Sequence, residues 1–136
     1  MIEFEHQVRV RYAEADRMGY VYYGNYAVYF EVARVEMLRS LGLPYKSLED
    51  KGIILPVSDF SVQYKKPAFY DDLLTIKTTI RKKPSVRIVF DYETFNEKGE
   101  LLNTASVTLV FVSKATGKPV NPTDEFNIVF TPYFQN

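Results

Sequence analysis

Cysteine is absent from the 136 residues, and its absence removes three kinds of chemistry. The chain cannot form disulfide bonds, bind a metal through thiolates or use a cysteine nucleophile. Histidine is nearly absent as well, since the chain contains only one, His6. A histidine-rich zinc site is therefore excluded, and any catalytic triad would depend on that one residue in a strand-like segment. If the chain is an enzyme, its acid–base chemistry falls to carboxylates.

An excess of charge of one sign is also missing, because 17 Lys and Arg balance 17 Asp and Glu. Proteins that bind nucleic acid or membrane surfaces carry a positive excess, so neither partner is expected. No apolar run approaches the roughly 18 residues that span a bilayer, and the first residues lack a signal-peptide pattern. With 46% hydrophobic and 25% charged residues, the composition is that of a globular protein. We expect a single cytoplasmic domain over residues 1–136.

A helical pattern runs from about Asn25 to Leu41. Apolar side chains recur there at spacings of three and four, and Gly42 and Pro44 follow as ending signals. Before it, residues 7–12 alternate as a strand does, and residues 13–24 predict a loop with two glycines. A short helical turn is compatible with residues 45–51. The chain thus predicts one long helix near its N-terminal end.

Beyond residue 58 the pattern changes to alternation with a period of two, which indicates strands. Four such stretches, around residues 59–64, 74–80, 86–92 and 101–111, are separated by turn signals that favour antiparallel neighbours. A helix and a sheet face must cover each other. We therefore predict an α+β fold in which a curved antiparallel sheet of about five strands wraps around the long helix. The last ~15 residues, interrupted by proline, predict a surface tail, and the uncovered sheet face and edges predict a homo-oligomer.

The loop before the helix places one carboxylate, Asp16, close to the helix start. The first N–H groups of the helix, around residues 23–26, lack partners inside it and carry the positive end of its dipole. Such amides can bind a carbonyl oxygen that becomes an oxyanion, while a carboxylate attacks the carbon or deprotonates a water. Asp and Gly are also common in simple turns, so the residue types alone leave both interpretations open.

The stretch YAEADRMGYVYYGNY at residues 12–26, followed by YFEVAR at 29–34, closely resembles the motif of hotdog-fold acyl-CoA thioesterases. The resemblance is greatest to the branch that contains 4-hydroxybenzoyl-CoA thioesterase and the Tol-Pal-associated acyl-CoA thioesterases. A second segment, YKKPAFYDD at residues 64–72, matches the strand and turn that follow the helix in that branch. The resemblance implies a hotdog fold that hydrolyses an acyl-CoA thioester in a pocket at a dimer interface, as a dimer or homotetramer. It implies no metal or redox cofactor, because coenzyme A enters as part of the substrate.

Individual roles follow from this resemblance alone. Asp16 matches the family's catalytic aspartate, which is a nucleophile or a general base depending on the member. Tyr23 matches the position whose backbone amide polarises the thioester carbonyl. The other matched positions shape the loop and helix entry or lie near the substrate: Gly19, Gly24, Asn25, Tyr26 and Glu31. For Glu31, a solvated or ion-paired helix residue is an equal alternative.

Coenzyme A carries phosphates, so a basic rim is expected near the mouth of the pocket. Two clusters qualify, the hairpin around residues 81–87 and the pair at residues 65–66. The resemblance makes Lys82, Lys83 and Ser85 candidates for nucleotide binding, although basic residues at a turn often only keep an edge soluble. Ser58 and Asp59 are expected to line the pocket from a strand beside the partner subunit's helix.

Two other functions remain open at this stage. The same site would suit acyl-carrier-protein thioesters if the basic clusters docked an acidic protein. A non-catalytic acyl-CoA binding protein on the same fold is the third alternative. The acyl group itself stays undetermined, since the tyrosine-rich segment at residues 20–26 suits an aromatic or a short aliphatic group.

Overall fold

The computed structural model describes residues 1–135. In chain order the strands are β1 (Ile2–Arg9), β2 (Ile53–Ile54), β3 (Val57–Tyr64), β4 (Leu73–Ile80), β5 (Arg87–Phe95), β6 (Leu101–Val110) and β7 (Val112–Ser113). The helices are α1 (Asn25–Ser40), α2 (Tyr45–Asp50) and α3 (Asp124–Phe130), with 3-10 turns at Tyr12–Glu14 and Thr131–Phe134. The long helix and the four later strands lie where the sequence pattern predicted them.

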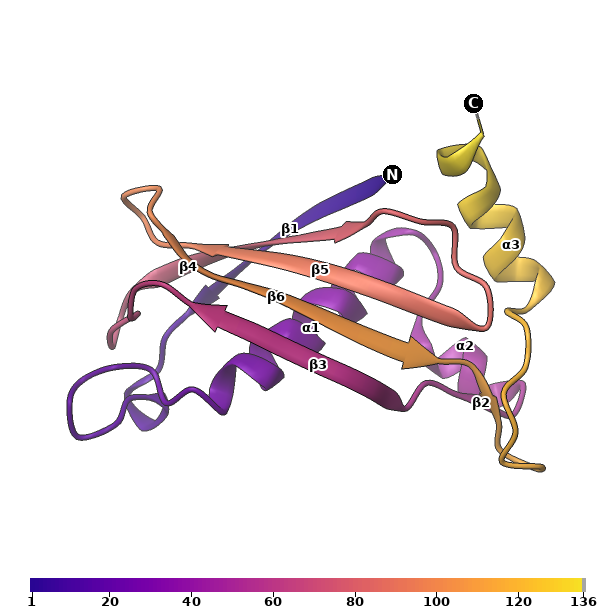
Figure 1. Cartoon of the computed structure of the whole chain (residues 1–136), viewed down its shortest axis with the longest axis horizontal. Coiled ribbons are helices and arrows are strands. Elements are labelled where there is room, and N and C mark those ends of the chain that lie inside the picture. The colour runs from indigo at the N-terminus through magenta and orange to yellow at the C-terminus, as the bar shows by residue number, and fades with distance from the viewer. Residues whose placement is uncertain (136) are drawn as a thin grey trace.

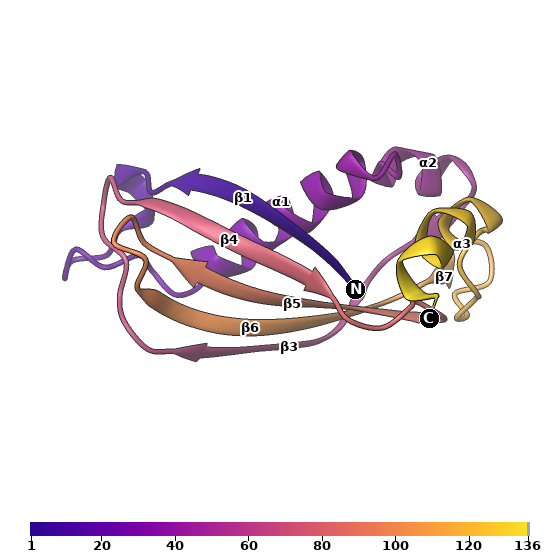
Figure 2. The same ribbon diagram turned by 90° about the horizontal axis from the view of Figure 1, so that it is seen from above.

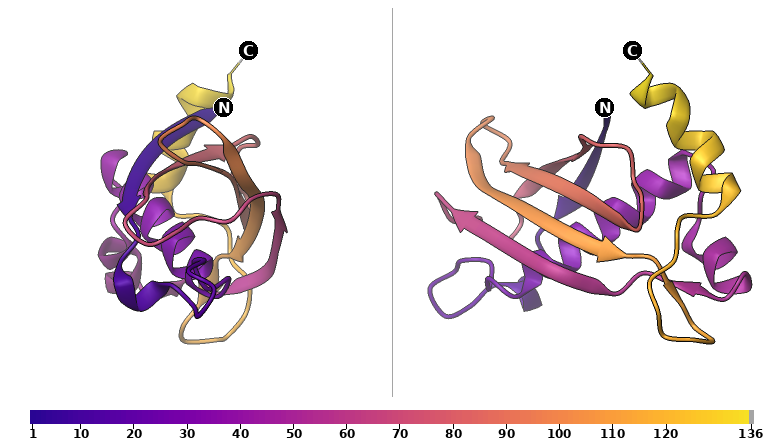
Figure 3. Two further views of the ribbon diagram at one scale, coloured as in Figure 1. Left: turned by 90° about the vertical axis from the view of Figure 1, so that its left-hand side faces the viewer. Right: turned by 45° about the vertical axis from the view of Figure 1, so that its right-hand side comes forward.

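Five strands form one antiparallel sheet in the order β1-β4-β5-β6-β3. The sheet is strongly curved, and α1 lies along its concave face (Figure 1, Figure 2). Viewed from one end, the strands curl around the helix (Figure 3). A separate two-stranded pair, β2 with β7, lies beside α2. The predicted α+β hotdog fold is therefore confirmed.

The core forms where the apolar stripe of α1 meets the inward side chains of the sheet. Phe30 and Ala33 on the helix are fully buried, and Phe30 stacks on Tyr92 of β5 with ring centroids 4.5 Å apart. Alternate residues of β5 are buried along its length, as the two-residue period of a strand requires. Burying a large apolar side chain contributes about 1.5–3 kcal/mol, so this contact fixes the helix against the sheet.

The C-terminal segment differs from the predicted surface tail. Residues 124–130 form α3, and its Phe126 and Phe130 are 0% and 1% exposed. Phe126 packs edge-on against Phe111 with ring centroids 5.4 Å apart. Thr123 caps the start of this helix, because its side chain accepts a hydrogen bond from the Phe126 amide. A seven-residue helix between prolines shows too few turns for its buried face to stand out in the sequence.

The first strand also differs in extent. It spans Ile2 to Arg9 rather than residues 7–12, because each of its eight residues pairs with β4. The chain then leaves the sheet, and Tyr12 lies in a 3-10 turn.

The two edges of the sheet are β1 and β3. Val57, Phe60 and Tyr64 of β3 remain between 41% and 51% exposed, although they are large and apolar or aromatic. Across residues 1–135, no helix is long and apolar enough to cross a membrane.

Candidate active site

The loop between β1 and α1 is held to the helix by Glu14. Its carboxylate accepts hydrogen bonds from the Arg11 amide at 2.8 Å and the Tyr29 hydroxyl at 2.9 Å. Its backbone carbonyl accepts two more, from the Tyr22 amide and the Asn25 side chain, both at 2.9 Å. Burial raises the pKa of Glu14, but the hydrogen bonds from Arg11 and Tyr29 outweigh it and hold the pKa below its ordinary value. An ionised, buried carboxylate thus fixes the shape of the loop.

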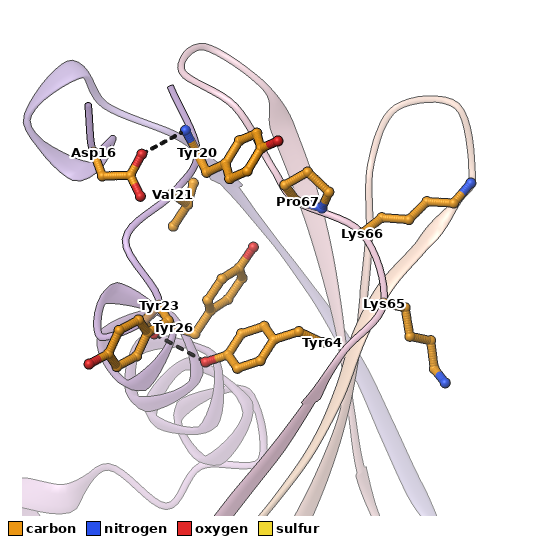
Figure 4. Close-up of a pocket in the computed structure, with 9 residues that line it drawn as sticks. All are labelled: Asp16, Tyr20, Val21, Tyr23, Tyr26, Tyr64, Lys65, Lys66 and Pro67. Carbon is orange, nitrogen blue, oxygen red and sulfur yellow. Dashed lines mark hydrogen bonds between the residues drawn. The ribbon is translucent and has the colours of Figure 1, made fainter. Parts of the chain in front are cut away.

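Asp16 is the exposed carboxylate of this loop. One oxygen, Oδ1, accepts a hydrogen bond from the amide of Met18 at 2.9 Å. It accepts a second from the amide of Tyr20 at 3.1 Å, which Figure 4 shows. Gly19 completes the turn with a φ of +82°, which a residue without a side chain adopts at little cost. Within residues 1–135, the other oxygen, Oδ2, has no hydrogen-bond partner. The turn therefore orients the carboxylate and leaves one of its oxygens available.

The start of α1 provides hydrogen-bond donors. In the described part of the chain, the amides of Tyr23 and Gly24 donate to no acceptor. They lie at the positive end of the helix dipole. Gly24 has an ordinary helical φ of −63°, but a Cβ there would lie 2.6 Å from the Tyr22 ring. The glycine therefore lets that ring fold close to the helix entry.

An open cleft of about 320 Å³ connects these groups (Figure 4). Its lining residues come from the loop, the helix start and the end of β3: Asp16, Tyr20, Val21, Tyr23, Tyr26, Tyr64, Lys65, Lys66 and Pro67. The Tyr64 hydroxyl donates a long hydrogen bond of 3.4 Å to the Tyr23 carbonyl, which ties the strand to the helix start. Within residues 1–135, no group of three or more His, Cys, Asp or Glu side chains is arranged to hold a metal ion.

The structure brings together part of the predicted site. Asp16, Tyr23 and Tyr26 line the cleft, and Gly19, Gly24 and Asn25 shape the segment that carries them. Glu31 is exposed on the next turn of α1 and does not line the cleft.

The remaining predicted residues lie at the end of the sheet opposite to Asp16. The connection from β4 to β5 carries Lys82, Lys83 and Ser85, and Figure 1 shows it beside α3. Since β4 has eight residues, a distance of roughly 26 Å separates its two ends. Ser58 and Asp59 also lie at the far end of their strand, where β3 begins. Within one chain, these five residues do not join Asp16.

Sequence reasoning missed two residues that the structure places at the site. Glu14 has no local signature as an anchor, because its partners come from both sides of the loop and from the helix. Tyr64 lies in the second matched segment, YKKPAFYDD, which was the available signal. Tyr64 lines the cleft only because the end of β3 lies beside the start of α1, and that tertiary contact could not be predicted from the sequence.

Comparison with known proteins gives concordant results. Residues 18–103 match the family described as "Thioesterase superfamily". YneP of Bacillus subtilis is 38% identical over 114 residues, which cover 84% of this chain and 83% of YneP. The acyl-CoA thioester hydrolase YbgC of Escherichia coli O157:H7 is 35% identical over 116 residues, 85% of this chain and 87% of YbgC.

A solved structure agrees with these sequence matches. The crystal structure of DHNA-CoA thioesterase from Staphylococcus aureus superimposes with a TM-score of 0.86 at 42% identity. The match covers 98% of this chain and 87% of that one. Family and fold thus agree: the chain belongs to the thioesterase superfamily and is a thioester hydrolase with the hotdog fold.

Proposed function

We propose that this chain hydrolyses acyl-CoA thioesters, with Asp16 acting at the thioester carbonyl carbon and the Tyr23 amide binding its oxygen. One observation carries the proposal: Asp16, with its oriented carboxylate, and Tyr23, whose amide has no acceptor within residues 1–135, line the same cleft. Asp16 lies just before the segment that matches the family, so its role rests on this geometry and on the motif. YbgC, described as an acyl-CoA thioester hydrolase, supports coenzyme A as the thiol portion of the substrate.

In the proposed reaction, water replaces the thiol at the carbonyl carbon. Asp16 either attacks that carbon, forming an anhydride that water then hydrolyses, or removes a proton from the attacking water. In both routes negative charge develops on the carbonyl oxygen, where a fixed amide lowers the barrier more than it stabilises the substrate. The products are the free acid and coenzyme A.

The complete site is proposed to require a second copy of the chain. β3 is an open edge with exposed apolar side chains, a feature that invites pairing with another strand. Antiparallel pairing of two β3 strands about a two-fold axis would place Ser58 and Asp59 of one copy near Tyr64 of the other. The basic β4–β5 connection of one copy would likewise lie toward the cleft end of the other. A dimer, or a homotetramer built from two such dimers, is the assembly that we expect.

Thiol release from a panel of acyl-CoA thioesters tests the proposal. Because the chain has no cysteine, a thiol reagent reports only the product. The same acyl group should be offered on coenzyme A and on acyl carrier protein, and we expect coenzyme A to be the better substrate. Faster release from the carrier protein would favour a carrier-protein thioesterase. Tight acyl-CoA binding without thiol release would instead identify a binding protein and refute the hydrolase.

A further inference from the structure

Tyr26 is the most deeply buried side chain that lines the cleft, with an exposed fraction of 2%. Its ring packs among those of Tyr29, Phe30 and Tyr64, with centroids 5.7, 6.0 and 5.7 Å away. A phenylalanine would make the same ring contacts without the cost of burying a hydroxyl. The hydroxyl at this position therefore needs an explanation other than packing.

The Tyr26 hydroxyl is held by two protein donors. Its oxygen accepts hydrogen bonds from the Ala68 backbone amide and from the Asn103 side chain. Burial raises the pKa of Tyr26 to about 12, and these two donors oppose the rise. The hydroxyl therefore keeps its proton at neutral pH. Because a hydroxyl has two acceptor lone pairs and one proton, it is left to donate to a further group.

This hydroxyl lies between the helix start and the Asp16 loop. The Ala68 carbonyl accepts a hydrogen bond of 2.8 Å from the amide of Val21, which also lines the cleft. Side chains of a helix lean toward its N-terminus, and Figure 4 shows the Tyr26 ring extending from α1 toward Val21. Tyr23 lies three positions earlier, and such positions share one face of a helix. Tyr23 and Tyr26 thus line the cleft from the same side.

We propose that the Tyr26 hydroxyl donates a second hydrogen bond to the thioester carbonyl oxygen, beside the Tyr23 amide, and that Asn103 positions this hydroxyl. The inference rests on the proposed function and adds a catalytic residue to that same site. When the carbonyl carbon becomes tetrahedral, negative charge develops on its oxygen, and the hydrogen bond from Tyr26 strengthens while the proton stays on the tyrosine. A donor that is fixed before the reaction stabilises this charge without reorganising.

Tyr26→Phe removes only the hydroxyl and tests the donor. The value of kcat/KM for acyl-CoA should fall about 10²–10³-fold, mostly in kcat, because the charge develops in the transition state. Tyr92→Phe is the matched control. Tyr92 is 1% exposed, burial also raises the pKa of its hydroxyl, and it does not line the cleft. This control should keep the wild-type kcat. Equal losses in the two variants would overturn the role of Tyr26.

A pair of substrates distinguishes the carbonyl oxygen from the leaving sulfur as the acceptor. The same acyl group is offered on coenzyme A and on thiophenol, a more acidic thiol that leaves with less help. If Tyr26 donates to the carbonyl oxygen, Tyr26→Phe should lose the same factor with both substrates. A loss that shrinks with the thiophenol ester would assign the donor to the sulfur and refute the proposed acceptor.

Asn103→Leu tests the positioning role. Leucine has a similar size but cannot donate to the hydroxyl, so kcat should fall, by less than in Tyr26→Phe. Because Asn103 acts through Tyr26, adding Asn103→Leu to Tyr26→Phe should cause no further loss. Losses that multiply in the double variant would refute the positioning role. If Asn103→Leu does not fold in a thermal melt, Asn103→Ser takes its place in the same comparison.

The outcomes separate this inference from the proposed function. If the wild type releases no thiol from any acyl-CoA, the proposed function fails. If Asp16→Asn is inactive while a folded Tyr26→Phe protein keeps the wild-type kcat, the proposed function stands and Tyr26 is not a catalytic residue.

Discussion

The two ends of the sheet differ in how their aromatic side chains are buried. At the end beside α3, Phe111, Phe126 and Phe130 are buried together, and aromatic contacts link each to the next. At the other end, Tyr12 and Tyr23 are 80% and 65% exposed beside helix amides without acceptors. Exposed rings and unpaired donors contribute little to folding, but they are what a substrate can bind. One end therefore stabilises the fold, while the other holds the groups of the proposed site in place through hydrogen bonds of Glu14 and Asp16.

This contrast predicts that substitutions at the two ends separate activity from stability. The largest effect is expected from Asp16→Asn. The new side chain can still accept the Met18 and Tyr20 hydrogen bonds, so the loop should keep its shape. Loss of the carboxylate should lower kcat/KM by about 10²–10⁴-fold with the unfolding midpoint nearly unchanged.

Asp71→Asn is the control for that change. Asp71 is an exposed aspartate in the turn between β3 and β4, and its φ of +69° is one that asparagine tolerates. It should retain activity. The proposed catalytic role of Asp16 would be refuted if the two variants lost activity equally. Full activity of Asp16→Asn would refute it as well.

The opposite pattern is expected from Phe126→Ala at the packed end. Removing a fully buried ring should lower the free energy of unfolding by about 3–5 kcal/mol, measured by urea titration. Below the unfolding transition, kcat/KM should stay within a few-fold of the wild type. Ile128→Ala on the same helix is the control, because Ile128 is 72% exposed and should change stability by less than about 0.5 kcal/mol. A small effect of Phe126→Ala would mean that α3 does not belong to the core.

A similar division appears in what the sequence could predict. Periodicity located α1 and the four later strands of the sheet, since burial on one face repeats within each element. It did not locate α3, whose Phe126 and Phe130 form only one turn-to-turn pair between two prolines. The motif predicted that Asp16 and the helix start lie together, since they are close in the chain, and the structure places Asp16 and Tyr23 at one cleft. It could not show that Lys82 and Lys83 lie at the opposite end of the sheet, since that follows from the direction of β4.

A smaller effect, dependent on pH, is expected at the site end from Glu14→Gln. The pKa of Glu14 is held below its ordinary value of 4.5, so its ionised form stabilises the folded state. Above about pH 4.5 the variant should be less stable than the wild type by about 1–2 kcal/mol. The difference should shrink as the pH falls through the lowered pKa, because the wild-type carboxylate then takes up a proton.

Urea titrations at several pH values measure that difference. Glu125→Gln is the control at the packed end, where the exposed Glu125 pairs with Lys51 at 2.9 Å. An exposed ion pair contributes about 0–1 kcal/mol, so this variant should show a weaker dependence on pH. If both variants respond alike, the buried network around Glu14 does not hold the loop.

The smallest effect is expected from Lys82→Ala combined with Lys83→Ala, and it tests whether the two ends meet in an assembly. Both lysines are exposed beside the packed end of their own chain and far from its cleft. If they bind the nucleotide of a substrate held by a second copy, the double variant should have a KM for acyl-CoA about 3- to 10-fold above that of the wild type. This increase should be smaller at high salt, which screens the charges. The same acyl group on pantetheine, which lacks the nucleotide, should be hydrolysed as by the wild type. Lys46→Ala on α2 provides an exposed control. Two results together would contradict this arrangement: the wild type sediments as a monomer, and the double variant keeps the wild-type KM. The two lysines would then not bind the nucleotide of a substrate held by a second copy.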